Sequence, residues 1–275
     1  MDDYREVNRA NWDERAGIHA ASSDYGVERF VADPHHLSDV VRFDRPRLGE
    51  VRGLRGIHLQ CHIGTDTVSL SRLGARMSGL DLSGESIRQA RLLAARAGEE
   101  VDFVQAEVYD APKVLRAGAF DLVYTGVGAL CWLPDVAAWA EVVATLLRPG
   151  GRLFMREGHP VLWALDDARP DRLLALEHPY FETLQPTVWH EDTTYVATQQ
   201  RLVSTTTHEW NHGLDEIVSA LLAAGMEPTG LVEHDSVPWE ALIGQMDRLP
   251  GGEWRVSGRP ERLPHSYTLQ GRRRG

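Results

Sequence analysis

The chain is predicted to form an α/β fold in which helices cover a mostly parallel sheet. Between residues 56 and 157, short apolar or β-branched runs alternate with longer amphipathic runs, as they do in sheets with helical crossovers. The length of 275 residues, with 43% hydrophobic and 25% charged residues, is sufficient for one substantial core. We therefore expect a single domain with an insertion.

The alternating region is expected to contain five strands and at least two clear helices. The strands are expected over residues 56–61, 76–81, 101–107, 120–125 and 152–157. One helix should begin after Ser83, whose hydroxyl can cap it, and end at Gly98, which can adopt the left-handed conformation. The other should run from about Val136 to Leu147, because Pro149 and the glycines after it cannot continue it.

The flanking segments have different patterns. The first 50 residues are expected to form one or two helices and a proline-marked loop. Residues 159–207 are rich in Pro, Thr and aromatic residues, and alternating stretches around 193–197 and 201–205 predict a β-containing lid. Helical spacing predicts a helix over 214–222, followed by strands near 229–234 and 266–271. We divide the single domain into an N-terminal helical cap (1–50), a core that holds the ligand (51–160), an inserted lid (161–210) and a closing part (211–275).

Polar residues follow the predicted strands at the edge where parallel sheets bind ligands. Asp81 ends the second strand about 20 residues beyond the first turn, a spacing at which a carboxylate can accept both hydroxyl protons of a ribose. Glu107 could accept from an adenine amine, and Leu82 and Val108 could enclose the base. The candidate ligand-binding set is Gln60, Cys61, His62, Gly64, Thr65, Asp66, Asp81, Leu82, Glu107, Val108, Thr125 and Gly126. The alternatives are that Asp81 is a turn or cap residue and that Glu107 is an exposed carboxylate.

Four runs in this region together resemble the class I S-adenosylmethionine-dependent methyltransferases. They are residues 79–83 (GLDLS) with Ile87, Ala90 and Arg91 after them, 103–107 (FVQAE), 120–123 (FDLV) and 147–153 (LRPGGRL). The resemblance covers residues 50–160 and, more loosely, the part after residue 213. It implies a Rossmann-like, seven-stranded, mostly parallel sheet with an antiparallel last strand and helices on both faces. It also implies that S-adenosylmethionine binds over the first turn.

The first turn departs from the family pattern of an acidic residue followed by Gly-x-Gly-x-Gly. Gln60 stands in place of the acid, His62 and Asp66 replace the outer glycines, and Gly64 remains. A β-carbon can obstruct close backbone approach to a ligand, but Gln60 can still form hydrogen bonds. Asp66 could cap the next helix or pair with the ammonium group of the cofactor. The run from Gln60 to Thr67 resembles a subset of small-molecule methyltransferases, so we interpret it as a variant cofactor site.

Methyl transfer requires orientation of the reactants, exclusion of water and, for some acceptors, a general base. His159 follows the fifth strand and is the first candidate for that base; the alternative is a loop histidine bonded to backbone. Trp12, His19, Tyr25 and Trp132 are candidates to close over the acceptor, although aromatic residues at such spacing also occur in ordinary cores.

His208, Glu209 and His212 match the His-Glu-x-x-His pattern of zinc proteases. That pattern requires a helix, whereas a β-like threonine run precedes it and Gly213 follows it. On an extended strand the two histidines would be about 13 Å apart, too far to share a zinc ion. A metalloprotease is therefore a distant alternative and no metal is expected. His208 and His212 are instead candidates to face the substrate, or are cap or surface histidines.

Charge and hydropathy limit the partners. The net charge of −11 and a basic run confined to residues 272–274 disfavour a nucleic-acid partner. Apolar runs are too short to span a membrane, and the start at Met1 and Asp2 lacks the features of a secretion signal. We expect a cytoplasmic monomer or homodimer with reduced cysteines that methylates oxygen or nitrogen of a small molecule. The altered first turn leaves one alternative open, an S-adenosylmethionine-binding protein of this fold that does not transfer methyl.

Overall fold

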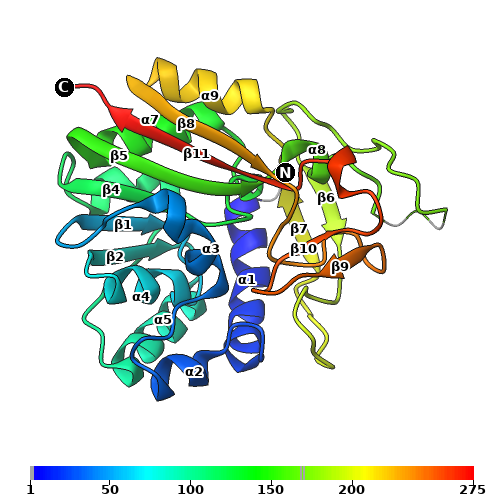
Figure 1. Cartoon of the computed structure of the whole chain (residues 1–275), viewed down its shortest axis with the longest axis horizontal. Helices are drawn as coiled ribbons and strands as arrows, with labels where there is room; N and C mark the ends of the chain where they lie inside the picture. The colour runs from blue at the N-terminus through cyan, green and yellow to red at the C-terminus, as the bar shows by residue number, and fades with distance from the viewer. Residues whose placement is uncertain (1–2, 168, 170) are drawn as a thin grey trace.

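The computed structural model describes residues 3–167, 169 and 171–275 and centres on a seven-stranded sheet (Figure 1). The strand order is β3-β2-β1-β4-β5-β11-β8. The strands are β1 (Arg55–Leu59), β2 (Arg76–Asp81), β3 (Asp102–Gln105), β4 (Phe120–Thr125), β5 (Leu147–Gly158), β8 (Met226–His234) and β11 (Ser266–Arg273). β1 to β5 run parallel, and β11 lies antiparallel between β5 and β8. The predicted fold class is confirmed, including the antiparallel last strand. Met1 and Asp2, on which the expectation about a secretion signal rests, lie outside the described residues.

Helices cover both faces of the sheet. One face packs against α7 (Val136–Leu146) and α9 (Leu214–Ala223), and the opposite face packs against α3 (Asp39–Leu48), α4 (Thr65–Arg72) and α5 (Gly84–Ala97). Ser83 caps α5 by accepting a hydrogen bond from the Ser86 amide, and Gly98 ends it with φ 71°. Both ends of α5 are as expected, because capping depends on residues that are close in sequence.

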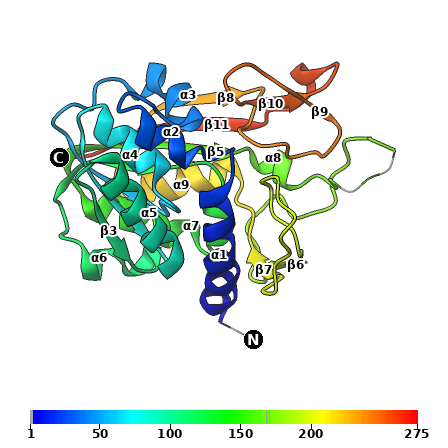
Figure 2. The ribbon, with the colours of Figure 1, turned by 90° about the horizontal axis from the view of Figure 1, so that it is seen from below.

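Three helices precede the sheet, whereas one or two were expected. They are α1 (Tyr4–Ala21), α2 (Val27–Ala32) and α3. α1 stands beside the carboxyl ends of the parallel strands, between α5 and a small two-stranded sheet (Figures 1 and 2). That small sheet pairs β6 (Thr187–His190) with β7 (Thr206–Glu209) in antiparallel fashion. α1 therefore connects the core to the segment that follows β5.

The strands expected around 193–197 and 201–205 are wrong. These residues lie in the connection between β6 and β7, and several of them form hydrogen bonds with side chains of α1. The Glu14 carboxylate accepts from the amides of Val203 and Ser204 at 2.7 and 2.9 Å, and Asn11 donates to the Ser204 carbonyl at 2.6 Å. Side chains of a helix thus take the place of a neighbouring strand there.

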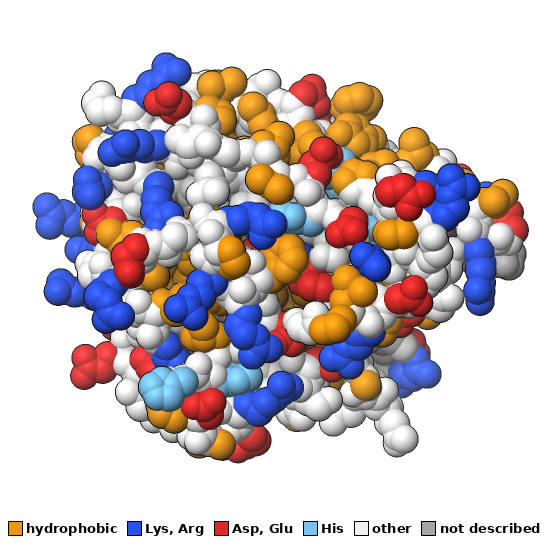
Figure 3. Space-filling view, viewed as in Figure 1, with side chains coloured by type: hydrophobic (Ala, Val, Ile, Leu, Met, Phe, Trp, Pro, Cys, Tyr) orange, Lys and Arg blue, Asp and Glu red, His pale blue; other side chains and the backbone are white. Residues whose placement is uncertain are grey.

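The remaining elements are short. They are α6 (Ala111–Val114), α8 (Pro160–Trp163), β9 (Met246–Arg248), β10 (Trp254–Val256) and the 3-10 turns η1 (Val108–Asp110), η2 (Leu130–Trp132) and η3 (Pro260–Arg262). The β9–β10 hairpin was not expected from the sequence. Within the described residues, no helix has both the length and the apolar character needed to cross a bilayer. On the face shown in Figure 3, basic side chains are scattered among acidic and apolar ones.

Candidate cofactor and acceptor site

The first turn joins β1 to α4 at the carboxyl edge of the sheet. Gln60 and His62 have φ values of +56° and +49°, and Gly64 has φ +80°. Two residues with side chains thus adopt the left-handed region that glycine prefers, which costs of the order of 1 kcal/mol each. His62 stands where the family pattern has its first glycine. The backbone at this position is therefore left-handed, as a glycine would allow, although a histidine stands there.

Asp81, at the end of β2, holds this turn in place. Its carboxylate accepts hydrogen bonds from the amides of His62 at 2.8 Å and Ser83 at 2.9 Å. Burial raises the pKa of Asp81 to about 6. Each oxygen retains a further lone pair, so the group can still accept from the two hydroxyls of a ribose. Asp81 is thus a turn residue, which was the alternative considered from the sequence, and it is also a carboxylate beside the first turn.

Gln60 and Thr125, near the turn, each bury a polar atom that has no partner among the residues that the structure describes. The Gln60 amide nitrogen donates to the Ala129 carbonyl at 2.8 Å, which leaves its Oε1 without a donor. The Thr125 hydroxyl, at the end of β4 beside Gly126, is also unpartnered. Buried acceptors without donors are uncommon, because each loses its hydrogen bonds to water. Gln60 is suited to accept from an ammonium group of a ligand.

Asp66 does not cap α4, which corrects one of its two expected roles. Gly64 occupies the N-cap position of α4 and no side chain caps that end. Burial raises the pKa of Asp66 to about 6, against the lowering influence of the Ser38 hydroxyl and of Arg156. Its carboxylate lies toward Gly126 and His58, on the side of the sheet that α3 covers. Cys61, Gly64 and Thr65 are buried in the turn.

Glu107 lies beyond β3 and caps η1. Its carboxylate accepts from the Tyr109 amide at 2.7 Å, and only 7% of the residue is exposed. Burial raises its pKa. The alternative of an exposed loop carboxylate is therefore wrong. Val108 is buried and Leu82 is half-buried.

The four aromatic candidates for the acceptor pocket come together around His62. The Trp12 ring lies 4.9 Å from His62 and 5.2 Å from Trp132, centroid to centroid. His19 lies 5.0 Å from His62 and stacks on Tyr25 at 5.2 Å. We call Trp12, His19, Tyr25, His62 and Trp132 the aromatic cluster. It joins α1, the first turn and η2 at one place.

A chain of hydrogen bonds runs from the core through the aromatic cluster to the β6–β7 connection. The His62 ring bonds to Ser86 at 3.1 Å and to His19 at 2.8 Å, and His19 bonds to Thr194 at 2.6 Å. Burial lowers the pKa of His19 to about 2 and that of His62 to about 3. Both rings are neutral at neutral pH, so each can donate from one nitrogen and accept at the other.

His159 is not free to act as a base. One ring nitrogen, Nδ1, accepts from the Val161 amide at 3.2 Å where His159 caps α8, and Nε2 lies 3.0 Å from Glu233. The residue is buried. Because one ring nitrogen bonds to the start of α8 and the other lies against Glu233 of β8, we do not assign the base to His159.

His212 lies in a loop after β7, and His208 lies on β7, the extended strand expected for this segment. The His212 ring bonds to Glu182 at 2.8 Å and to the Leu133 carbonyl at 2.8 Å, so both ring nitrogens are engaged and the ring connects two loops. His208 and Glu209 lie in β7, and the helix that the metalloprotease pattern requires is absent from this segment. No group of three or more potential metal ligands is found among the residues that the structure describes.

Comparison with known proteins agrees with this geometry. The family model described as "Methyltransferase domain" matches residues 57–153. A ubiquinone biosynthesis O-methyltransferase from Xanthomonas axonopodis pv. citri is 36% identical over 124 residues, covering 44% of this chain and 51% of that protein. One from Cronobacter sakazakii is 34% identical over 150 residues, covering 54% and 61%. The chain thus spans between half and two thirds of the length of these relatives.

A solved structure of an S-adenosylmethionine-dependent methyltransferase from Listeria monocytogenes has the same fold. It superimposes with a TM-score of 0.62 at 14% identity, covering 86% of this chain and 97% of the other. Residues 57–153 thus match a methyltransferase domain, and the chain shares the fold of the solved methyltransferase. Asp81 and the first turn lie within this methyltransferase domain, whereas much of the aromatic cluster lies outside the matched residues.

Two functional candidates outside the methyltransferase domain, Arg15 and Tyr195, were missed by the sequence analysis, and a third, Glu209, was considered there only within the metalloprotease pattern. Arg15 is buried on α1 beside Trp12, Tyr195 bonds through its hydroxyl to that of Tyr25, and Glu209 lies in β7. A signal for Arg15 was available. The buried residues of α1 include Asn8, Asn11, Arg15 and His19, which follow helical spacing with polar in place of apolar side chains.

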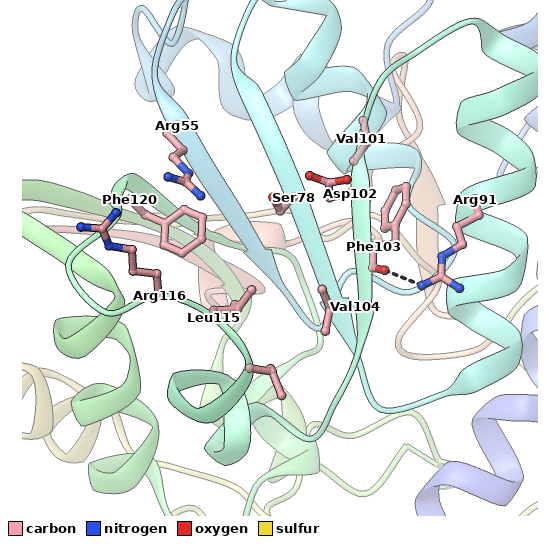
Figure 4. Close-up of a pocket in the computed structure, with 11 residues that line it drawn as sticks. Arg55, Ser78, Arg91, Val101, Asp102, Phe103, Val104, Leu115, Arg116 and Phe120 are labelled. Carbon is pink, nitrogen blue, oxygen red and sulfur yellow. Dashed lines mark hydrogen bonds between the residues drawn. The ribbon is translucent and has the colours of Figure 1, made fainter.

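A cavity elsewhere in the molecule is unrelated to this site. It has a volume of about 580 Å³ and is lined by residues at the amino ends of the parallel strands, among them Arg55, Asp102 and Phe120 (Figure 4). Ligands of such sheets bind at the opposite, carboxyl edge. The methyltransferase domain therefore has its candidate site at the first turn and not in this cavity.

Proposed function

We propose that this chain is an S-adenosylmethionine-dependent methyltransferase that methylates an oxygen or nitrogen atom of a small molecule. The observation that carries the proposal is the contact between Asp81 and the His62 amide, which puts a carboxylate against the first turn of a methyltransferase domain. A cytoplasmic location, a monomeric or homodimeric state and the absence of a nucleic-acid partner stay predictions of the sequence.

The residues at the carboxyl edge fit the cofactor. In the proposal, Asp81 accepts from the ribose hydroxyls, Leu82 and Val108 enclose the base, and Gln60 Oε1 accepts from the ammonium group. The fit of Gln60 rests on its buried oxygen, which has no donor among the described residues. Bound S-adenosylmethionine supplies an electrophilic methyl carbon. The chain has to hold that carbon in line with the acceptor and keep water away.

Two parts of the chain are proposed to orient the acceptor and exclude water. The aromatic cluster offers flat apolar surfaces at the carboxyl edge, and residues 161–210 act as an inserted lid above them. The bond from His19 to Thr194 ties the lid to α1 at 2.6 Å. His19 and His62 stay neutral because burial lowers their pKa, so these two histidines place no positive charge beside a sulfonium.

The cofactor part is tested by calorimetry with S-adenosylhomocysteine. Asp81→Asn should lower the affinity by about tenfold or more, because a hydrogen bond to a charged group contributes about 1.5–3 kcal/mol. Asn keeps the acceptor oxygen for the His62 amide and gives up only the one for the Ser83 amide, so a melting temperature is measured beside the affinity to show that the variant is folded. The matched control is Asp102→Asn, an exposed carboxylate at the opposite edge of the sheet, which should bind as the wild type does. Equal affinity of Asp81→Asn and wild type would contradict the placement of the nucleoside.

Turnover is tested with labelled S-adenosylmethionine and a panel of small hydroxyl and amine compounds. Transfer to at least one compound, lost on heating the protein, would support the enzyme. Cofactor binding without transfer to any compound would contradict the catalytic part of the proposal and favour a binding protein of the same fold.

A further inference from the structure

α1 buries an arginine in the candidate site without a counter-ion. Arg15 is 6% exposed, and its Nε is buried without a partner. The side chain forms no hydrogen bond or ion pair with any residue that the structure describes. Its one contact of note is the Trp12 ring, whose centroid lies 5.4 Å from the guanidinium carbon. Arginine remains charged in proteins, so this is a buried and uncompensated positive charge.

The titratable groups around Arg15 do not compensate its charge at neutral pH. Burial keeps His19 and His62 neutral by lowering their pKa, and raises the pKa of Tyr25 and Tyr195. The electrostatic influence of Arg15 reaches all four of these groups. They come from α1, the first turn, the α1–α2 connection and the β6–β7 connection. The guanidinium therefore faces the place where the core, α1 and the proposed lid meet.

Glu209 is the acidic group to consider as an internal partner. Its carboxylate bonds to the Thr207 hydroxyl at 3.2 Å and forms no ion pair with Arg15. Burial raises its pKa to about 7, although the charge of Arg15 acts to lower it. A carboxyl that is half protonated at neutral pH neutralises the guanidinium incompletely. Since burying an unpaired charge costs several kcal/mol, the arrangement favours binding of a further anion.

The position of Arg15 indicates which ligand would supply the anion. Asp81 and Gln60 lie on the side of the methyltransferase domain, where the proposal places the nucleoside and the ammonium group. Arg15 lies against Trp12, and its charge also reaches Tyr195 and Glu209 of the segment 161–210. These are acceptor-side residues in the proposed function. The planar guanidinium fork matches a carboxylate bidentately.

We propose that Arg15 binds a carboxylate of the methyl acceptor, so that the substrates are small carboxylic acids that carry a hydroxyl or amine group. This inference rests on the proposed function and narrows its substrate class. It assigns Arg15 to substrate binding and orientation, without a role in proton transfer.

The test compares small hydroxy- and amino-carboxylic acids with their amides, which have nearly the same shape without the charge. Aliphatic, aromatic and heteroaromatic pairs are added to protein with and without saturating S-adenosylhomocysteine, and the thermal shift is measured. Wild type should be stabilised by at least one acid at concentrations tenfold below those its amide requires. Arg15→Gln should remove that preference, and Arg15→Lys should restore it in part because it keeps the charge. If no acid binds wild type more tightly than its amide, the proposal is overturned.

Three controls separate the alternatives. Arg9→Gln, at an exposed position of the same helix, should keep the wild-type preference. Calorimetry should show that Arg15→Gln binds S-adenosylhomocysteine as the wild type does; a tenfold loss would instead assign Arg15 to the carboxylate of the cofactor and overturn the acceptor assignment. A merely structural Arg15 would lower the melting temperature while leaving the acid-over-amide preference intact, which also contradicts the proposal.

The outcomes distinguish failure of this inference from failure of the proposed function. If wild type binds no S-adenosylhomocysteine, the proposed function fails, yet an acid preference lost in Arg15→Gln would still establish the carboxylate site. If the cofactor binds normally and no acid is preferred, only the inference about Arg15 fails.

Discussion

The methyltransferase domain and the contact between α1 and the segment 190–210 are built from different kinds of polar interaction. In the domain, the site carboxylates bond to amides nearby in the chain, as Asp81 does to Ser83 two residues later. Between α1 and the segment 190–210, partners are far apart in sequence: Asn8 and His208 are separated by 200 residues, and Glu14 and Val203 by 189. Local patterns can therefore predict the first region, but the second depends on tertiary structure.

Asn8 shows how the second region is assembled. Its side-chain amide donates to the His208 carbonyl at 2.8 Å and accepts from the His208 amide at 2.8 Å. This pair of bonds is the one that a neighbouring strand would make with the open edge of β7. α1 thus protects a strand edge with a side chain, which explains why its buried face is polar.

The largest expected effect comes from a long-range contact in which a charge is buried. Arg156 of β5 is fully buried and forms two hydrogen bonds with Glu253, at 3.0 and 2.7 Å, from the connection between β9 and β10. Glu253→Gln should lower the free energy of unfolding by about 3–5 kcal/mol, because it leaves the guanidinium buried without the carboxylate that pairs with it. Chemical denaturation measures this change.

The control for this prediction is an exposed pair in the same part of the chain. Asp235 and Arg255 are 3.5 Å apart, and their side chains are 58% and 41% exposed. Asp235→Asn should change the free energy of unfolding by less than about 1 kcal/mol, since water and salt screen such pairs. Equal effects of the two substitutions would remove the distinction between buried and exposed long-range contacts.

The pH dependence of the free energy of unfolding should change when the buried Glu209 is replaced, and should stay the same when an exposed carboxylate of the methyltransferase domain is replaced. Burial raises the pKa of Glu209 to about 7, so the stability associated with its neutral form is present below about pH 4.5 and lost as pH rises through 7. From pH 5 to pH 8, the free energy of unfolding should therefore fall by roughly 2 kcal/mol less in Glu209→Gln than in wild type. Urea unfolding across this range measures it. Glu100→Gln, at an exposed site between α5 and β3, should leave the profile unchanged, and an unchanged profile for Glu209→Gln would contradict the burial of its charge.

Other buried groups of the site also titrate, which is why the variants are compared with wild type and not judged from one profile. Burial raises the pKa of Asp66 and Asp81 to about 6 and that of Glu157 to about 7. Their contributions to the stability of the protein therefore also fall as pH rises. His19 and His62 act in the opposite direction, because their lowered pKa values make stability rise with pH up to about 6.5.

The sequence predicted those parts of the fold and site whose causes are local. The ends of α5 follow from Ser83 and Gly98, and the spacing of Asp81 from the first turn follows from one strand–turn–helix unit. Arg15 was missed because the buried face of α1 lacks the apolar periodicity by which buried faces are recognised. The strands near 193–205 were misplaced because residues from the start of the chain supply their hydrogen bonds, as Glu14 does for Ser204.

The smallest effect is expected at Asn8 and should be local. Asn8→Ala removes two hydrogen bonds at the edge of β7, where water can replace them, so the free energy of unfolding should fall by about 1 kcal/mol. Hydrogen exchange of the β7 amides should nevertheless become several-fold faster, while that of β2 stays the same, because β2 lies within the sheet between β1 and β3. Glu6→Ala, on the exposed side of α1, is the matched control and should alter neither strand. Faster exchange in β2 as well as β7 would mean that α1 supports the methyltransferase domain as a whole, and the two regions would then unfold as one.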